Sequence, residues 1–170
     1  MLNFSAMEQE TKKQILDILS RDSRMSHGKI ASMLAVSEEA VREAVLDLEK
    51  DRIIKKYNVT IDWQKAGVEK VVAFVDVNVT PAREVGFEAV AMRIARYPQV
   101  RGAWLISGGS DLRLLVETDS INQLAAFVAE DLATIDGVTG TNTNFHLRKY
   151  KEEYCLYDEP EADERLVVSP

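Results

Sequence analysis

The spacing of the apolar residues changes at about residue 68, and this change limits the possible folds more than any other feature of the chain. Before it, apolar residues recur every three or four positions, as in amphipathic helices. After it, the pattern of a strand alternates with that of a helix. A chain of 170 residues has room for one domain or two small ones. We therefore expect a helical module followed by an α+β domain.

Three short helices are expected in the first 50 residues. The first runs between Glu8 and Ser20. Ser26 is suited to cap a second helix that runs to about Leu34, and Ser37 to cap a third. The third helix has one apolar stripe, formed by Val41, Ala44, Val45 and Leu48. Two helices joined by a three-residue turn and packed on another helix are typical of a helix-turn-helix.

The segment after the third helix has the alternation of a half-buried strand. Tyr57, Val59 and Ile61 alternate with polar residues, so we expect a strand that makes the module winged. The expected boundaries are residues 1–52 for the helix-turn-helix and 53–67 for the wing and linker strand.

Residues 68–151 have the expected order β-α-β-β-α-β, which is a ferredoxin-like unit. Its hairpin turns at Gly108 and Gly109, and the last strand is expected over residues 138–150. Ser120 and Gln123 have the spacing of a capping box before the second helix. Two helices cover only one face of a four-stranded sheet, so we expect the other face to meet a partner subunit.

The formal charge of −7 argues at first against a nucleic-acid-binding protein, because phosphate contacts need Lys and Arg. The acidic residues, however, lie mainly in the second half of the chain. Residues 1–62 hold 10 Lys and Arg against 11 Asp and Glu, whereas residues 149–170 hold 3 against 7. We expect residues 152–170 to form an acidic tail.

Several classes of protein are disfavoured by the sequence. The single cysteine, Cys155, predicts neither a disulfide nor a zinc site, and His27 and His146 are too far apart in sequence for a metal motif. The chain has no GxGxxG, P-loop, GxSxG or HExxH motif, so we expect no cofactor and no enzymatic activity. The chain has no apolar run long enough to span a membrane and no signal pattern at its start, which favours the cytoplasm.

Four features resemble, in their order and spacing, the Lrp/AsnC family of feast/famine transcription regulators over residues 8–151. They are the context of Arg24, the stretch IASMLAVS, the passage LE-x-x-x-I-I from Leu48 to Ile54, and the turn SGG-x-D from Ser107 to Asp111. The resemblance implies a homodimer formed through the C-terminal sheets, often assembled into an octamer. It also implies binding of double-stranded DNA, and of a small amino acid near the glycine turn.

The third helix is expected to enter the major groove of DNA, where Arg reads guanine and Lys neutralises phosphates. The formal charges on its outer face nevertheless sum to −1. Typical family members have basic residues where this chain has Ala44, Leu46 and Asp47. Positive charge lies beside the helix, and serines at helix N-termini suit phosphate oxygens. The expected DNA-binding residues are Arg24, Ser26, Lys29, Ser37, Glu39, Arg42, Lys55 and Lys56.

The glycine turn predicts an effector site. Its backbone N–H groups can approach the carboxylate of an amino acid, and Asp111 can take the ammonium group. The resemblance adds hydroxyl groups from the last strand. The expected effector-binding residues are Gly108, Gly109, Ser110, Asp111, Thr139 and Thr141. The same turn also suits a tight hairpin that binds no ligand, and the family usually has a large residue where Ser110 stands.

Three functions remain open at this point. The first is a sequence-specific DNA-binding regulator that responds to a small effector, and it is the one we favour. The second is an amino-acid sensor with weak or lost DNA binding that acts through a protein partner, which the acidic outer face of the third helix favours. The third is an enzyme resembling sirohaem decarboxylases, but these tend to have His and aromatic residues in the hairpin segment that reads ISGGSDLRLLV here, and this segment has none.

Overall fold

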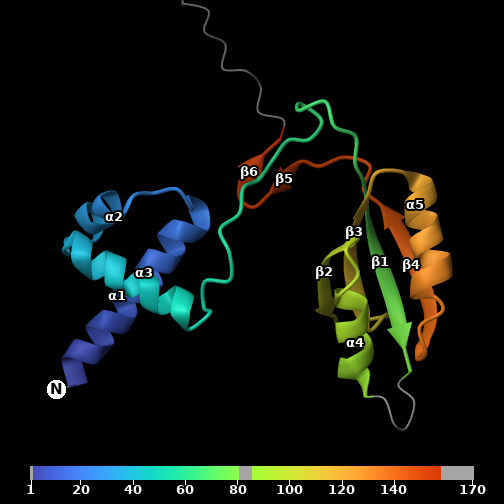
Figure 1. The fold of residues 1–170 in the computed structure, drawn as a ribbon, viewed down its shortest axis with the longest axis horizontal. Coiled ribbons are helices and arrows are strands. Elements are labelled where there is room, and N and C mark those ends of the chain that lie inside the picture. Colours follow the sequence, from blue (N-terminus) through green and yellow to red (C-terminus); the bar gives the residue numbers. More distant parts are fainter. Residues whose placement is uncertain (1, 81–85, 158–170) are drawn as a thin grey trace, which may run out of the picture. The chain divides into compact units, whose positions relative to one another are not determined.

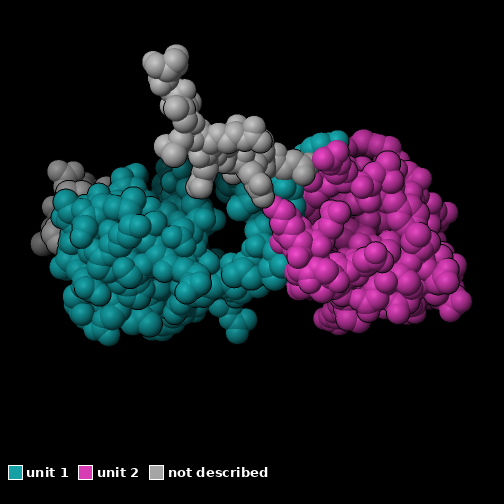
Figure 2. Space-filling view, turned by 90° about the horizontal axis from the view of Figure 1, so that it is seen from above, with its two compact units in different colours: residues 1–61, 150–170 teal, residues 62–149 magenta. Residues whose placement is uncertain are grey.

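The computed structural model describes residues 2–80 and 86–157, which form two compact units (Figures 1 and 2). The first unit comprises the described residues up to 61 together with those from 150 onward. The second comprises those between 62 and 149. None of the described helices is both long and apolar enough to cross a membrane.

The first unit contains α1 (Leu2–Arg21), α2 (His27–Leu34) and α3 (Glu38–Lys50). Both expected caps are confirmed. The Ser26 hydroxyl accepts a hydrogen bond from the Lys29 N–H at 3.3 Å, and the Ser37 hydroxyl accepts one from the Ala40 N–H at 3.1 Å. The three helices share a core made of Ile15, Leu19, Ile30, Ala31, Val41, Val45 and Leu48. These features confirm the helix-turn-helix.

The expected strand over residues 57–61 is wrong. The structure assigns no strand there, and the side chains of Tyr57, Val59 and Ile61 are all exposed. An alternating pattern becomes a strand only when another strand offers its backbone hydrogen bonds, and residues 55–62 pair with no strand in the described part of the chain. The segment is held by side chains instead: the Ser23 hydroxyl donates to the Asn58 carbonyl at 3.2 Å.

A short hairpin was not expected from the sequence. It consists of β5 (Lys151–Glu152) and β6 (Cys155–Leu156), and its two turn residues, Glu153 and Tyr154, have φ values of 45° and 69°. Two consecutive left-handed residues favour a tight two-residue turn between antiparallel strands. The hairpin takes in the start of the expected acidic tail, and residues 158–170 lie outside the described residues.

The second unit has the expected ferredoxin-like order. Its strands are β1 (Val71–Val79), β2 (Val100–Leu105), β3 (Leu112–Thr118) and β4 (Val138–Phe145), arranged antiparallel in the order β2-β3-β1-β4. Between them lie α4 (Phe87–Ala95), α5 (Ile121–Ala126) and the π-helical turn η1 (Phe127–Leu132). The last strand ends at Phe145, earlier than the sequence pattern indicated.

The helices cover one face of this sheet. Ala73, Val75 and Val77 of β1 are fully buried and pack with residues of β3, α4 and α5 in one core. The capping box is present in a modified form. The Ser120 hydroxyl accepts from the Gln123 N–H at 3.2 Å, but the Gln123 side chain accepts from Asp119, at 3.0 Å, rather than from Ser120.

Candidate DNA-binding surface and effector site

The outer surface of α3 is acidic. Arg42 donates two hydrogen bonds to the Glu39 carboxylate one turn earlier, the one from Nε at 3.1 Å. This bidentate pair lowers the pKa of Glu39 and raises that of Arg42. Asp47 pairs with Lys12 of α1 at 3.1 Å. The helix carries five acidic residues against two basic ones, Arg42 and Lys50. Arg42, which the sequence predicted to face DNA, is therefore paired with the Glu39 carboxylate.

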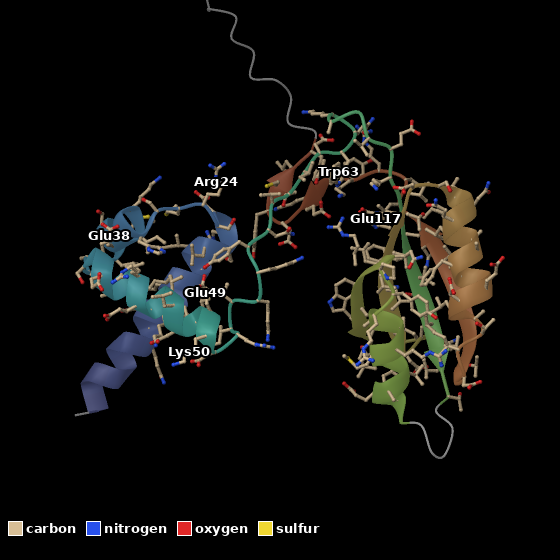
Figure 3. The ribbon with its side chains drawn as sticks, viewed as in Figure 1. Arg24, Glu38, Glu49, Lys50, Trp63 and Glu117 are labelled. Atoms are coloured by element: carbon tan, nitrogen blue, oxygen red, sulfur yellow. The ribbon has the colours of Figure 1, made fainter. Side chains whose placement is uncertain are left out.

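Cations beside α3 are more accessible. Arg24 lies in the loop before α2 (Figure 3), and the N–H of the same residue donates to the Asp22 side chain at 3.0 Å. Lys29, Lys55 and Lys56 are exposed. Within residues 2–80 and 86–157, none of these four cations forms an ion pair with another side chain. They are available to an anion such as a DNA phosphate.

The hairpin turn between β2 and β3 is fixed to the end of β1 through Asp111. Its carboxylate accepts a hydrogen bond from the Val79 N–H at 2.8 Å, its own N–H donates to the Val77 carbonyl at 3.1 Å, and its carbonyl accepts from the Ile106 N–H at 2.9 Å. Asp111 therefore shapes this end of the sheet as well as carrying charge there.

The other expected effector residues lie at the same end of the sheet but on different faces. Gly108 has φ 131°, which favours glycine, and a Cβ at Gly108 or Gly109 would meet no atom within 4 Å. The Thr139 hydroxyl donates to the Asn78 carbonyl at 3.3 Å. Thr141 pairs with Val77, whose side chain belongs to the core under the helices.

A cavity of about 580 Å³ opens beside this turn, and Gly109 and Ser110 line it. Two further lining residues, Asp76 and Arg113, were missed from the sequence. Arg113 donates from Nε and Nη2 to the two carboxylate oxygens of Asp76 at 2.7 and 2.9 Å, which lowers the pKa of Asp76 and raises that of Arg113. The sequence did contain a signal for this pair, since β1 has a single acid, Asp76, and β3 a single base, Arg113, among mostly apolar residues.

The sheet face away from the helices is partly apolar. Arg113 lies over the Phe74 ring, with its Cζ 5.7 Å from the ring centre, and His146 meets the same ring edge-on at 4.7 Å. Trp104 folds over Gly102, where a Cβ would clash with the indole, and Trp104 remains 49% exposed. This face has the mixed character of a surface that binds another protein.

Two family models match the chain, one over the helices of the first unit and the other over most of the second unit and the β5–β6 hairpin. Residues 8–55 match a winged helix-turn-helix DNA-binding model, and residues 72–156 match the Lrp/AsnC ligand binding domain. The chain belongs to the Lrp/AsnC family. It is thus a DNA-binding transcriptional regulator with an effector domain, and these matches indicate a regulator rather than an enzyme.

Relatives of this Lrp/AsnC regulator are described as HTH-type transcriptional regulators. The HTH-type transcriptional regulator YugG of Bacillus subtilis is 40% identical over 162 residues, which cover 95% of this chain and 98% of YugG. LrpA of Pyrococcus abyssi is 36% identical over 133 residues, which cover 78% of this chain and 92% of LrpA.

Solved structures of 20–21% identity agree in fold. A transcriptional regulator of Neisseria meningitidis in complex with L-Met aligns with a TM-score of 0.68 and 21% identity, over 88% of this chain and 94% of that one. AsnC of Escherichia coli aligns with a TM-score of 0.65 and 20% identity, over 84% and 94% of the two chains.

The backbone just after α3 takes an unusual conformation at Arg52. This residue follows the C-cap Asp51, and its φ is 56°, in the left-handed region that favours glycine.

Proposed function

We propose that this regulator binds double-stranded DNA as a homodimer through cations beside α3, and that a small amino acid bound near the 106–111 turn changes DNA binding or assembly. The observation that carries the DNA half is a contrast within the described residues: Arg42 pairs with Glu39, whereas Arg24, Lys29, Lys55 and Lys56 form no ion pair there. Phosphate contacts by such residues supply affinity, whereas base contacts supply sequence preference. Ser26, Ser37, Glu39 and Arg42 complete the proposed contact set.

The effector half rests on the chemistry around the turn. Backbone N–H groups at Gly108 and Gly109 suit a carboxylate, and Asp111 keeps one carboxylate oxygen beyond its bond to Val79 for an ammonium group. Ser110, Thr139 and Thr141 supply hydroxyl groups at the same end of the sheet. An effector shifts an assembly only if it binds its two states unequally, so we place the effector where copies meet.

The open face of the sheet is the proposed dimer surface. The half-buried Phe74 and Leu115, which pair across β1 and β3, and the exposed Trp104 give it apolar area, and the Asp76–Arg113 pair gives it a polar centre. A two-fold interface uses the same patch on both copies. Further assembly of dimers, as far as an octamer, would bring the turn regions of neighbouring dimers together.

The test is a fluorescence-anisotropy titration of the protein against the DNA upstream of its own gene, at two salt concentrations, with and without a pool of the twenty amino acids. We expect specific binding with a negative salt slope and a change in affinity on adding the pool. Binding that is absent even at low salt would contradict the DNA half of the proposal.

Replacing Glu39 by Gln is expected to raise DNA affinity roughly tenfold at about 0.1 M salt, because it releases Arg42 and removes one negative charge from the surface facing DNA. The same anisotropy titration measures the effect. Glu130→Gln, which changes the charge equally on an exposed part of η1, serves as the control and is expected to leave the affinity unchanged.

Replacing Asp111 by Asn is expected to abolish the effector response while DNA binding and folding persist. The amide oxygen of Asn still accepts from the Val79 N–H, whereas Ala would leave that donor unpaired at a cost of about 1–3 kcal/mol. Isothermal calorimetry with single amino acids measures the loss. Asp131→Asn, on the exposed surface of η1, is the matched control. A normal response in Asp111→Asn would remove Asp111 from the site.

A second function is favoured by one observation, the acidity of α3. Glu38, Glu43 and Asp47 are exposed there (Glu38 is labelled in Figure 3), and a surface of this sign suits a basic protein better than DNA. An amino-acid sensor that acts through a protein partner would bind the pool of amino acids but fail to bind DNA at low salt.

A further inference from the structure

A cleft of about 620 Å³ lies within the first unit and takes no part in the effector site. It is formed by the end of α1, residues 53–60 and the β5–β6 hairpin. Four cations line it, Arg21, Arg24, Lys55 and Lys56, against two anions, Asp22 and Glu153. Arg21 also pairs with Asp17 at 3.4 Å, an exposed contact of small energetic weight. The cleft is thus positive in a chain whose net charge is −7.

The lining of the same cleft is partly apolar. Its apolar members are Leu16, Leu19, Ile53, Ile54 and Val59. Ile53 and Val59 keep 56% and 61% of their surface exposed. An occupant that fits this surface therefore combines negative charge with short apolar side chains.

The described chain ends beside this cleft. Glu153 and Cys155 line it, and Tyr157 is anchored two residues later. The Tyr157 N–H donates to the Tyr150 carbonyl at 3.0 Å, and its hydroxyl donates to the Glu152 carboxylate at 2.8 Å. The next thirteen residues read DEPEADERLVVSP, five acids and one base followed by Leu166, Val167 and Val168. A chain of this length reaches roughly 40 Å when extended.

We propose that residues 158–170 dock in this cleft, with their acids facing Arg24, Lys55 and Lys56 and their apolar triplet facing the exposed apolar lining. The same cations are the proposed phosphate contacts, so the docked segment competes with DNA. This second step rests on the proposed function, whereas docking does not require DNA binding. Residues 158–170 thus compete with DNA for the cleft within the same chain, and salt weakens their binding there.

Cys155 allows docking to be measured in the full chain without DNA. It is the single cysteine, it is exposed, and it lines the cleft. The test compares its rate of alkylation by iodoacetamide in the natural chain and two variants. The apolar variant carries Leu166→Ser, Val167→Ser and Val168→Ser. The charge variant carries Asp158→Asn, Glu159→Gln, Glu161→Gln, Asp163→Asn and Glu164→Gln.

We expect alkylation to be about three- to tenfold faster in both variants, a factor set by the share of molecules whose cleft is free. The apolar variant keeps the net charge, so its faster reaction cannot come from a change in local charge. Equal rates in all three proteins would overturn the proposal. Protection of Cys155 by a DNA duplex, together with equal rates in its absence, would assign the cleft to DNA alone.

The DNA step is tested with the same three proteins. Both variants are expected to bind upstream DNA about three- to tenfold more tightly than the natural chain at low salt. Shielding of Cys155 without DNA binding by any of the three would support docking and contradict the proposed DNA function. Tight DNA binding that is equal in all three would overturn the competition.

Discussion

Replacing Arg24, Lys55 and Lys56 together by alanine is expected to weaken DNA binding on the order of 100-fold at about 0.1 M salt. Each phosphate contact releases roughly one counterion, so the slope of log affinity against log salt should flatten by about 3. Anisotropy titrations at four salt concentrations measure both quantities. The loss should be similar for specific and unrelated DNA, because phosphate contacts carry no sequence information.

A matched control separates these contacts from a general effect of charge. Lys65, Arg93 and Arg96 are three exposed cations of the second unit, and replacing them by alanine changes the net charge by the same amount. Their loss is expected to leave the salt slope unchanged. An equal loss of affinity in the two triple variants would contradict the proposed contacts and indicate only long-range attraction.

Replacing Phe127 by alanine is expected to destabilise the second unit by about 3–5 kcal/mol, the usual cost of deleting a large aromatic side chain from a core. Phe127 is 2% exposed, and its ring meets Tyr97 edge-on at 5.3 Å. It also begins the π-helical turn η1, so its position depends on an irregular backbone. Chemical denaturation measures the change.

The two tryptophans make this measurement specific to one unit. Trp63 and Trp104 are the only ones in the chain, and both belong to the second unit (Trp63 is labelled in Figure 3). Their fluorescence therefore follows its unfolding alone. Ile121→Ala, on the exposed side of α5, is the control and should change stability by less than about 1 kcal/mol. A similar effect in both variants would contradict the packing role of Phe127.

Local signals in the sequence predicted the fold well wherever a short-range rule decides the structure. Ser26, Ser37 and Ser120 cap helices because a side-chain oxygen three residues before a free N–H suffices. The strands of the second unit form where apolar and polar residues alternate and a neighbouring strand supplies the backbone hydrogen bonds. The segment around Val59 has the same alternation but no neighbouring strand, and only the tertiary structure decides that difference.

The candidate site was harder to predict because its properties depend on which two side chains contact each other, and not on single residues. Arg42 and Glu39 have the spacing of a helical ion pair, but sequence reasoning considered only their net charge. Asp76 and Arg113 are 37 residues apart and meet only because β1 and β3 pair in that register. Asp111 was predicted for its charge, whereas its bond to the Val79 N–H gives it a structural role besides.

The Asp76–Arg113 pair affects which chains can form a dimer with this one. At the two-fold interface proposed above, the open face would present this pair twice, and each copy of the sheet would have to accommodate the charges of the other. Removing one member of a pair that has lost its water leaves an uncompensated charge, which costs more than an intact pair contributes. A related regulator with apolar residues at these two positions would therefore form mixed dimers poorly. In the proposed dimer the pair would therefore favour two identical chains over a mixed dimer.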